Sequence, residues 1–396
     1  MSKNFKVLST RLRGETVKKI LLLNNVKIAF CNNNLSGFYL FRKDIYKHFV
    51  AQGYEVIVLY PKCLDEPRYL EMISKDCKCI AVNMLPNSQN PIADYKLYKE
   101  IKSVYAKERP DIVFNFTIKP NIYSALAASS LGIRTIDMMA GLGYVFDGNS
   151  MKKKIARALY KCGLSKAERV IVLNQDNYDT VVDKYVNRKK LVLFEGGEGV
   201  NMHEYHFQEN LFNEIRFLMV ARLLYDKGFQ QFVDAARIVK QKYPDIKFEL
   251  LGGFSEDSPT GVKKAVLQEY VNEGIIEYLG ETNDVPSYVL RDGTVVVVVS
   301  YYMEGMNRAL MEACSMGRPI ITTNLPGREE MVEDGKTGYC IEPKSAEALA
   351  EACIKFIKLP REEKMKMAKA SYEKCKKQFD VNLVIQKYDY LIKGTI

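Results

Sequence analysis

The sequence lacks the features that mark membrane-spanning and secreted proteins. It contains no run of about 18–20 apolar residues, the length that a helix needs to cross a bilayer. The apolar run at 20–23 ends at Asn24, and no small-residue cleavage site follows it. We therefore expect neither a transmembrane helix nor a secretory signal.

Metal ligands and disulfide spacings are also scarce. The nine cysteines include no Cys-x-x-Cys pair, and there are only three histidines. A zinc site is not expected from this set, nor is a disulfide framework in a chain of 396 residues. No Asp-x-Asp occurs, so we expect no cofactor and no divalent metal on a bound diphosphate. These absences favour a cytoplasmic protein.

Positive charge is concentrated in the first half of the chain. The net charge is +10, yet residues 1–200 carry 32 Lys and Arg against 19 Asp and Glu, whereas residues 201–396 carry 26 against 29. This asymmetry indicates an anionic partner for the first half, either a membrane surface or nucleic acid. No nucleic-acid module is present and the cations are not interleaved with an aromatic platform, so we expect no nucleic acid.

The segment 151–166, MKKKIARALYKCGLSK, is predicted to form a cationic amphipathic helix. Such a helix can lie on an anionic membrane, here the inner face of the plasma membrane. An ordinary helix with one face in the core fits the pattern equally well.

Short apolar runs alternate with longer amphipathic stretches, which predicts βαβ units and parallel sheets covered on both faces. Strands are predicted at 26–31, 55–60, 78–82, 111–116, 134–138, 169–173, 191–194, 215–220, 247–252, 275–279, 294–299 and 319–323. A turn-rich, aperiodic stretch at 196–214 separates two series. The fold class is therefore α/β with two doubly wound domains, 1–205 and 206–374, and a final helical segment near 375–396 that can pack on the first.

Ligands of such sheets lie at the carboxyl ends of the strands, where helix N-termini present N–H groups to anions. The loop after the strand 215–220 contains Arg222 and Lys227, followed by Gly228 and a predicted helix. Two cations in this position suit a diphosphate. The alternative is a solvated basic loop.

The loop after the strand 294–299 contains Glu304 and Glu312, eight residues apart across a glycine turn. Carboxylates accept hydrogen bonds from sugar and ribose hydroxyls, and Gly305 lets a ligand approach the backbone closely. Alternatively, Glu304 complements the dipole of the following helix and Glu312 is a solvated helix residue.

Taken together, these motifs resemble the retaining GT-B glycosyltransferases of family 4. The resemblance is carried by Ala221-Arg222-x4-Lys227-Gly228, Glu304-x7-Glu312, Met316-Gly317-Arg318-Pro319 and Asn324-x-Pro326-Gly327-x-x-Glu330. In the first half, 116–121 (FTIKPN) and 141–146 (GLGYVF) resemble the branch that assembles bacterial surface polysaccharides.

The resemblance implies a GT-B fold of two Rossmann-like domains facing a cleft, with the donor on the second domain and the acceptor on the first. Arg222 and Lys227 would bind the donor diphosphate, Glu304 the sugar ring and Glu312 the ribose. The implied catalytic residues are Arg222, Lys227 and Glu304; the implied donor-binding residues are Glu312, Gly305, Met306, Asn307 and Arg308.

On the acceptor side, the candidates are Gly37, Lys119, Gly141 and Gly143. Two departures from the family are evident: Asn307 stands where many members of this branch have proline, and no histidine lies near 139–143. We expect either a backbone group or Lys119 to serve there, although Lys119 can equally be a surface lysine.

The resulting expectation is a retaining glycosyltransferase. It would move a hexose or N-acetylhexosamine from a nucleotide diphosphate sugar, with UDP expected, to a glycan or polyprenyl-diphosphate-linked acceptor in capsule or O-antigen synthesis. Two alternatives stay open: a GT-B sugar-nucleotide epimerase or hydrolase, and a catalytically degenerate binding subunit.

Overall fold

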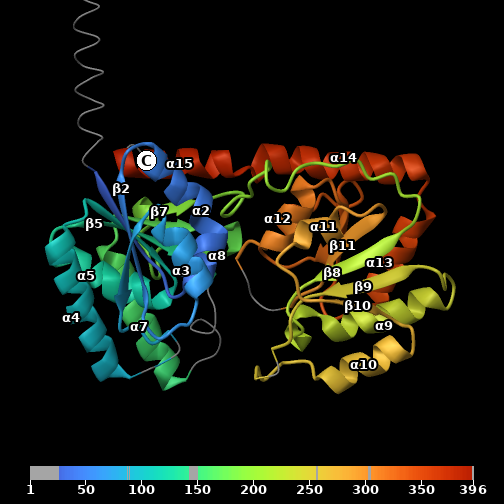
Figure 1. Cartoon of the computed structure of the whole chain (residues 1–396), viewed down its shortest axis with the longest axis horizontal. Helices are drawn as coiled ribbons and strands as arrows, with labels where there is room; N and C mark the ends of the chain where they lie inside the picture. Colours follow the sequence, from blue (N-terminus) through green and yellow to red (C-terminus); the bar gives the residue numbers. More distant parts are fainter. Residues whose placement is uncertain are drawn as a thin grey trace, which may run out of the picture. The chain divides into compact units, whose positions relative to one another are not determined.

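The computed structural model describes residues 26–86, 88, 90–141, 150–255, 257–301 and 305–394. The chain divides into two compact units (Figure 1). The first unit comprises Met1–Phe194 and Ile385–Ile396, and the second comprises Glu195–Val384.

The first unit is built on a seven-stranded parallel sheet. The central strands are short and largely buried, as expected for a sheet that helices cover on both faces, whereas the two edge strands are more exposed. The strands lie in the order β3 (Lys78–Val82), β2 (Glu55–Pro61), β1 (Lys27–Cys31), β4 (Ile112–Phe116), β5 (Arg134–Met139), β6 (Arg169–Val172) and β7 (Leu191–Leu193).

Alternate residues of these strands serve two separate cores. Ala29 and Cys31 face helices α4 and α5, while Phe30 stacks with aromatic rings from α2 and β4. The helical elements are α2 (Leu35–Ala51), α3 (Pro67–Ser74), α4 (Pro91–Glu108), the π-helical η1 (Pro120–Ser124), α5 (Ala125–Ser129), α7 (Met151–Lys166), α8 (Gln175–Val181), the 3₁₀ turn η2 (Arg188–Lys190) and most of α15 (Val381–Lys393).

The second unit repeats this plan with six parallel strands. Their order is β10 (Glu277–Gly280), β9 (Lys247–Leu251), β8 (Arg216–Val220), β11 (Thr294–Val298), β12 (Ile320–Thr323) and β13 (Gly338–Ile341). The helical elements are η3 (Tyr225–Lys227), α9 (Phe229–Lys240), α10 (Lys264–Asn272), α11 (Val285–Val289), α12 (Arg308–Ser315), η4 (Glu329–Met331), α13 (Ala346–Lys358) and α14 (Arg361–Gln378).

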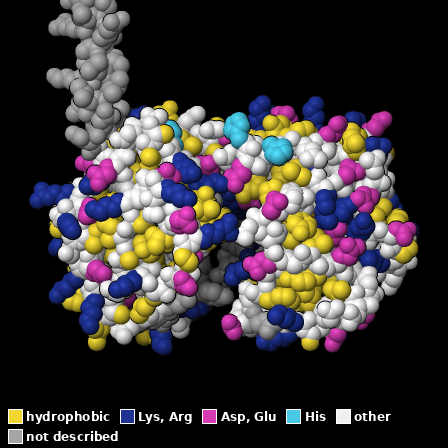
Figure 2. All heavy atoms as spheres, in the orientation of Figure 1, with side chains coloured by type: hydrophobic (Ala, Val, Ile, Leu, Met, Phe, Trp, Pro, Cys, Tyr) yellow, Lys and Arg dark blue, Asp and Glu magenta, His cyan; other side chains and the backbone are white. Residues whose placement is uncertain are grey.

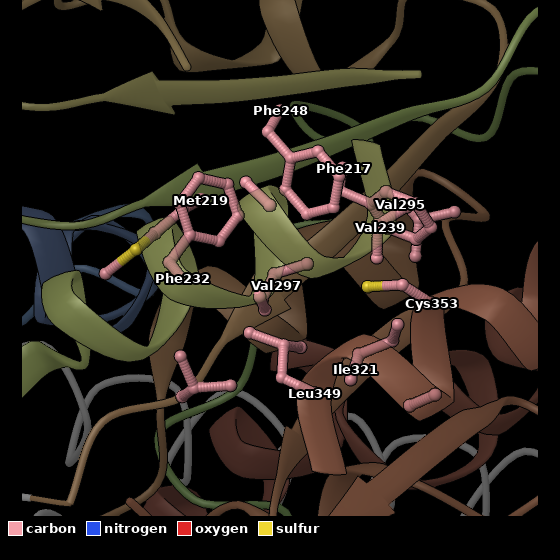
Figure 3. Packing of buried hydrophobic residues seen from close by; sticks show 14 of the residues in the cluster. Phe217, Met219, Phe232, Val239, Phe248, Val295, Val297, Ile321, Leu349 and Cys353 are labelled. Carbon is pink, nitrogen blue, oxygen red and sulfur yellow. The ribbon is translucent and has the colours of Figure 1, made fainter. Parts of the chain in front are cut away.

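The core under one face of this second sheet is dry and densely packed (Figure 3). Phe217, Phe248 and Val297 project from three strands toward Leu349 and Cys353 of α13. All five are almost completely buried. This packing holds the carboxyl ends of the strands at fixed positions, which is the requirement for a preorganised site.

The chain passes between the units at two points, and these two segments are hydrogen-bonded to each other. The Val200 N–H donates to Phe379 O (2.7 Å), and the Val381 N–H donates to Val200 O (3.0 Å). Gly196 and Gly199 have positive φ, and a Cβ on either would lie within 3 Å of the backbone at Gln378 or Val381. The glycines of this stretch are therefore required by close contact.

The predicted fold class of two doubly wound α/β domains is confirmed. The predicted helix 151–166 has the bounds of α7. Two predictions were incomplete. The strand β13 was missed, and the final helical segment predicted near 375–396 contains the end of α14 and then α15, because Phe379 and Asp380 interrupt the helix.

Candidate active site

In the second unit, strand order reverses between β8 and β11, and ligands of open α/β sheets bind at such a point. The chain runs from β8 into β9 on one side, whereas β11 and β12 lie on the other. The loops that follow β8, β11 and β12 therefore emerge side by side at the same edge of the sheet. These loops carry nearly all of the donor-side residues that the sequence predicts.

A chain of hydrogen bonds joins the three loops. The Tyr301 N–H donates to Asp226 O (3.0 Å), so the loop after β11 is fixed to the loop after β8. The Thr323 hydroxyl at the end of β12 donates to Ser300 O (3.0 Å). Arg328 Nε donates to Thr323 Oγ1 (3.1 Å). The loops thus form one connected framework.

Lys227 ends the turn η3, and Gly228 begins helix α9. Gly228 has a φ of +88°, and a Cβ there would lie 2.4 Å from Val299 O. Only glycine fits this position, because it combines a left-handed backbone with direct contact to β11. No side chain caps the N-terminus of α9. Its first N–H groups are thus oriented toward the same edge as Lys227, an arrangement suited to an anion.

The Lys227 ammonium is held in a positively charged, partly desolvated place. Its pKa is lowered to about 8, mainly by burial, with further contributions from the charge of Arg222 and, more weakly, Arg328, while Asp226 opposes the shift. Arg222 itself is exposed at the rim. An excess of cations around a buried lysine is relieved when an anion binds, so the arrangement favours a ligand such as a diphosphate.

Arg328 is a residue that the sequence interpretation missed. Its side chain is completely buried, and burial lowers its pKa to about 10 while Glu330 opposes this shift. Glu330 also accepts a hydrogen bond from the Gly327 N–H (2.7 Å). Arg328 lies 101 residues beyond Lys227, and the two loops are brought together by the pairing of β11 with both β8 and β12.

Glu312 and Arg308, both predicted to bind the donor, are paired with each other. Arg308 Nε lies 2.6 Å from Glu312 Oε1, one helical turn away on α12. Both side chains are mostly buried, and the Arg308 guanidinium lies over the Tyr205 ring at 5.8 Å. Glu312 is therefore neither a solvated helix residue nor an isolated acid. Its carboxylate is held in place by a neighbour.

The Gly305–Asn307 loop is tied to the loop after β12. The Asn307 N–H donates to Gly327 O (3.1 Å), and the Asn307 side chain caps α12 by accepting from the Leu310 N–H (3.2 Å). A proline at 307 would lose the first of these bonds. The Asn307 N–H is thus engaged with the loop after β12 in this structure, and its predicted role in donor binding stays a prediction.

Gly305 and Met306 lie at the start of this loop. Met306 packs against Gly197 of the interdomain stretch, where a Cβ would lie 2.6 Å from Met306 Cβ. Glu304, the predicted sugar-contact residue, lies outside the described residues. The donor candidates that the structure describes, Arg222, Lys227, Gly305, Met306, Asn307, Arg308 and Glu312, all follow β8 or β11 at one edge of the sheet.

In the first unit, the acceptor-side candidates follow β1, β4 and β5, which are neighbours at the point where that sheet reverses order. Gly37 lies in the first turn of α2, where a Cβ would lie 2.4 Å from Asn34 Oδ1, the atom that caps the helix. Gly141 follows β5, and Gly143 lies outside the described residues.

Lys119 is not a surface lysine. It is 9 % exposed, and its Nζ lies 2.5 Å from Asp94 Oδ1 on α4. The Tyr123 hydroxyl donates to the other oxygen of Asp94 (2.9 Å). Lys119 therefore anchors the loop after β4 to α4.

Thr117, at the start of the same loop, has an unusual backbone conformation and hydroxyl environment that the sequence did not predict. Its φ is +74°, a strained value for a β-branched residue, and its buried hydroxyl has no hydrogen-bond partner among the described residues. The π-helical turn η1 follows directly. Strained residues and π-turns are concentrated at functional sites, so both features support a ligand-binding role for this edge.

Among the described residues, no three His, Cys, Asp or Glu side chains are grouped as metal ligands would be.

Comparison with known families covers most of the chain. Residues 19–174 match the family model described as glycosyl transferase 4-like, and residues 201–374 match glycosyl transferases group 1. The chain is a glycosyltransferase of this GT4-like family. The predicted family and enzyme class are thereby confirmed.

Two relatives illustrate the range of this glycosyltransferase family. An N,N'-diacetylbacillosaminyl-diphospho-undecaprenol α-1,3-N-acetylgalactosaminyltransferase of Campylobacter jejuni is 25 % identical over 92 % of this chain and 97 % of its own length. A UDP-Gal:α-D-GlcNAc-diphosphoundecaprenol α-1,3-galactosyltransferase of Escherichia coli is also 25 % identical, over 70 % of this chain and 72 % of its own.

Solved structures of glycosyltransferases share the fold. A glycosyltransferase from Rickettsia africae matches 94 % of this chain and 99 % of its own with a TM-score of 0.75 and 21 % identity. HepE from Anabaena, in complex with UDP-glucose, matches 93 % and 99 % with a TM-score of 0.75 and 18 % identity. The predicted GT-B fold is confirmed.

Proposed function

We propose that this glycosyltransferase moves a hexose or N-acetylhexosamine from a UDP-sugar to a polyprenyl-diphosphate-linked glycan, with retention of anomeric configuration. The observation that carries the proposal is the group of Arg222, Lys227 and Arg328 beside the uncapped N-terminus of α9. A nucleoside diphosphate is a small ligand whose negative charge would balance these cations and the N-terminus of α9.

The donor and acceptor classes are proposed from the relatives. The names of the Campylobacter and Escherichia enzymes specify acceptors linked to undecaprenol through a diphosphate, and the second also specifies UDP-galactose. HepE, which has the same fold, binds UDP-glucose. A UDP-sugar donor and a lipid-linked acceptor are therefore the combination that we expect here, as part of surface polysaccharide synthesis.

The proposed chemistry depends on charge that develops on the departing nucleotide. When the bond between the sugar and the diphosphate breaks, negative charge grows on the diphosphate oxygens. Arg222 and Lys227, fixed beforehand, stabilise that charge without a metal ion. The acceptor hydroxyl attacks from the face that the nucleotide leaves, and its proton passes to the departing diphosphate.

In this proposal, Glu312 accepts hydrogen bonds from the ribose hydroxyls, and Arg308 keeps its carboxylate oriented. Glu304 and the N–H groups of Gly305 and Met306 contact the sugar. On the first unit, the loop around Lys119 and the glycines at 37, 141 and 143 receive the acceptor. The basic helix α7 contacts the anionic membrane in which the lipid-linked acceptor is anchored.

Calorimetric titration of UDP, GDP and ADP in the presence of EDTA tests the donor site. We expect UDP to bind, and to bind more weakly to Glu312→Ala. If none of the three nucleotides binds, the degenerate-subunit alternative becomes the better description. Selective binding of GDP or ADP would mean that the donor carries that nucleotide in place of UDP. Because EDTA is present, it would still support a site that needs no metal.

The reaction is tested by incubating the enzyme with UDP-N-acetylgalactosamine, with and without a synthetic undecaprenyl-diphosphate-linked acceptor sugar. We expect release of UDP to require the acceptor, and NMR of the product to show an α-linkage. UDP release at full rate without the acceptor would support the epimerase or hydrolase alternative. A β-linkage would contradict retention.

A further inference from the structure

Large hydrophobic side chains are exposed on one part of the first unit. They belong to α4 and α7, which both contact η1 and α5, and to the turn between α5 and β5. Soluble proteins rarely expose a contiguous group of this kind unless it binds a partner. The residues are Ile92, Tyr95, Leu131, Met151, Ile155 and Leu159.

Helix α7 carries apolar residues on two faces. Tyr160 and Leu164 are buried in the core of the first unit. Met151, Ile155 and Leu159 are spaced by four residues, so they lie on one stripe of the helix, and their exposed fractions are 70 %, 55 % and 41 %. The alternative of an ordinary helix with a single apolar face in the core is therefore insufficient, because the described residues of its own unit leave the outer stripe exposed.

A groove of about 620 Å³ lies between α4 and α7. Its lining is mostly apolar and includes Tyr95, Tyr98 and Tyr123, with Leu126 and Leu159. The rings of Tyr95 and Tyr98 stack with centroids 6.3 Å apart. Tyrosine, which has an apolar ring and a polar tip, is enriched where a protein meets both hydrocarbon and water.

Positive charge surrounds this groove and stripe. Helix α7 contains no acidic residue, and the exposed lysines of α4 and α7 border the apolar side chains. Figure 2 shows basic side chains beside hydrophobic ones on the visible face of the first unit, with acidic side chains among them. Long lysine stems can lie along apolar surface while their ammonium groups reach lipid phosphates. The lysines are Lys96, Lys99, Lys152, Lys154, Lys161 and Lys166.

We propose that this surface, the α4–α7 face, docks on an anionic bilayer with Met151, Ile155 and Leu159 inserted among the lipid chains. The tyrosines of the groove would then lie at the level of the headgroups. The inference rests on the proposed lipid-linked acceptor, and it goes further by making apolar insertion, in addition to charge, the source of membrane affinity. No helix among the described residues is long and apolar enough to span the bilayer, so the contact is with its surface.

A single introduced tryptophan tests insertion directly, because the chain contains none. In Leu159→Trp, we expect a blue shift of the emission when vesicles of phosphatidylglycerol and phosphatidylcholine are added. We also expect quenching when the lipids carry bromine in their acyl chains. The matched control is Leu211→Trp, at a leucine of similar exposure in the second unit, which should show neither effect.

Charge and insertion are separated by salt and by a second variant. Replacing Lys152, Lys153 and Lys154 with Gln should reduce flotation with anionic vesicles at low salt. Replacing Met151, Ile155 and Leu159 with Gln should abolish the part of the binding that survives high salt. Flotation of the wild type without quenching at position 159 would overturn the proposal, as would equal flotation of the wild type and the apolar variant, or no flotation at all.

The donor site of the proposed function is tested independently of the membrane contact. UDP titration of the same tryptophan variant reports on the donor site regardless of vesicle binding. Quenching by brominated lipid without UDP binding would leave the membrane face standing and overturn the donor assignment. UDP binding without quenching by brominated lipid would support the donor site and overturn the proposed membrane face.

Discussion

The pKa of Lys227 is set by the groups that surround its side chain. A lysine in water is charged throughout the physiological range, whereas this one has a pKa lowered to about 8, first by burial and then by Arg222. In the proposed function, the charged form is the one that would bind the diphosphate. Its population falls as the pH rises through 8, so the vacant site loses its affinity for anions under mildly alkaline conditions.

The lowered pKa of Lys227 predicts how nucleotide binding depends on pH. Between pH 7 and 8 the affinity for UDP should vary little, and above 8 the logarithm of the association constant should fall toward a slope of about one per pH unit. Calorimetry over pH 7–9.5 measures the slope. Lys227→Met should bind more weakly and lose this titration. The same slope in that variant would mean that another group titrates.

Glu312 gives a second prediction at this scale. Glu312→Ala should weaken UDP binding by about 1–3 kcal/mol, because the ribose hydroxyls lose a buried acceptor. The fold should also lose about 1–3 kcal/mol, because the mostly buried Arg308 guanidinium loses its carboxylate partner. Titration and chemical unfolding measure the two effects. Glu351→Ala, at an exposed acid of α13, should change neither; an unchanged affinity in Glu312→Ala would remove its proposed role.

Arg222, Lys227 and Glu312 were selected from their spacing to glycine turns and strand ends, and the structure brings the segments that carry them to one edge of the sheet. Their role in donor binding stays a prediction. Arg328 was missed, because its place beside Lys227 depends on strand pairing across a long sequence separation. The Lys119–Asp94 pair was missed for the same reason, since nothing in the local sequence relates α4 to the loop after β4.

At the scale of elements, the turn from β8 into α9 depends on one glycine. Gly228→Ala should destabilise the second unit and abolish UDP binding, because the Cβ would collide with Val299 O at 2.4 Å as well as strain the backbone. Gly274→Ala is the matched control, with a φ of +69° and nothing within 4 Å of the new Cβ. That variant should cost only about 1–2 kcal/mol of backbone strain.

Unfolding in denaturant and UDP titration compare the two variants. The difference in free energy of unfolding between them isolates the contact with β11 from the cost of the left-handed backbone. Equal losses would show that the close approach to Val299 is tolerated by a small shift, and the requirement for glycine would then be conformational only.

Elements were predicted best where periodicity was strong. The bounds of α7 and the centres of the buried strands came from runs of apolar residues. The strand β13 has four residues and begins with a glycine, so its pattern was too short to detect. The outer stripe of α7 shows a further limit: a sequence gives the number of apolar residues on a helix, but the fold decides which of them are covered.

At the scale of the whole molecule, the first unit is discontinuous in sequence. Tyr388 of α15 is 1 % exposed, and its ring centroid lies 5.3 Å from Phe114 and 5.5 Å from Phe194. Arg134 also donates to the carbonyl oxygens of Leu391 and Ile392 (3.1 and 2.9 Å). The last helix therefore completes the core of the first unit.

Tyr388→Ala should consequently destabilise the first unit by about 3–5 kcal/mol, the usual range for truncating a large buried aromatic side chain. Because the two units need not unfold together, hydrogen exchange is the appropriate measurement. Peptides of β1 and β4 should exchange faster, while those of β8 and β11 should not change. Leu383→Ala, at a partly exposed position of the same helix, should leave both sets unchanged.

The return of α15 to the first unit also has a consequence for biosynthesis. Domains generally fold in the order in which the ribosome makes them, beginning at the N-terminus. Here residues 195–384 are translated in full before the segment 385–394 that the first unit requires. The second unit can thus finish folding first. The first unit, with its exposed apolar face, is completed only after residues 195–384 have been translated, so its residues 26–194 lack the helix that completes their core for that whole period.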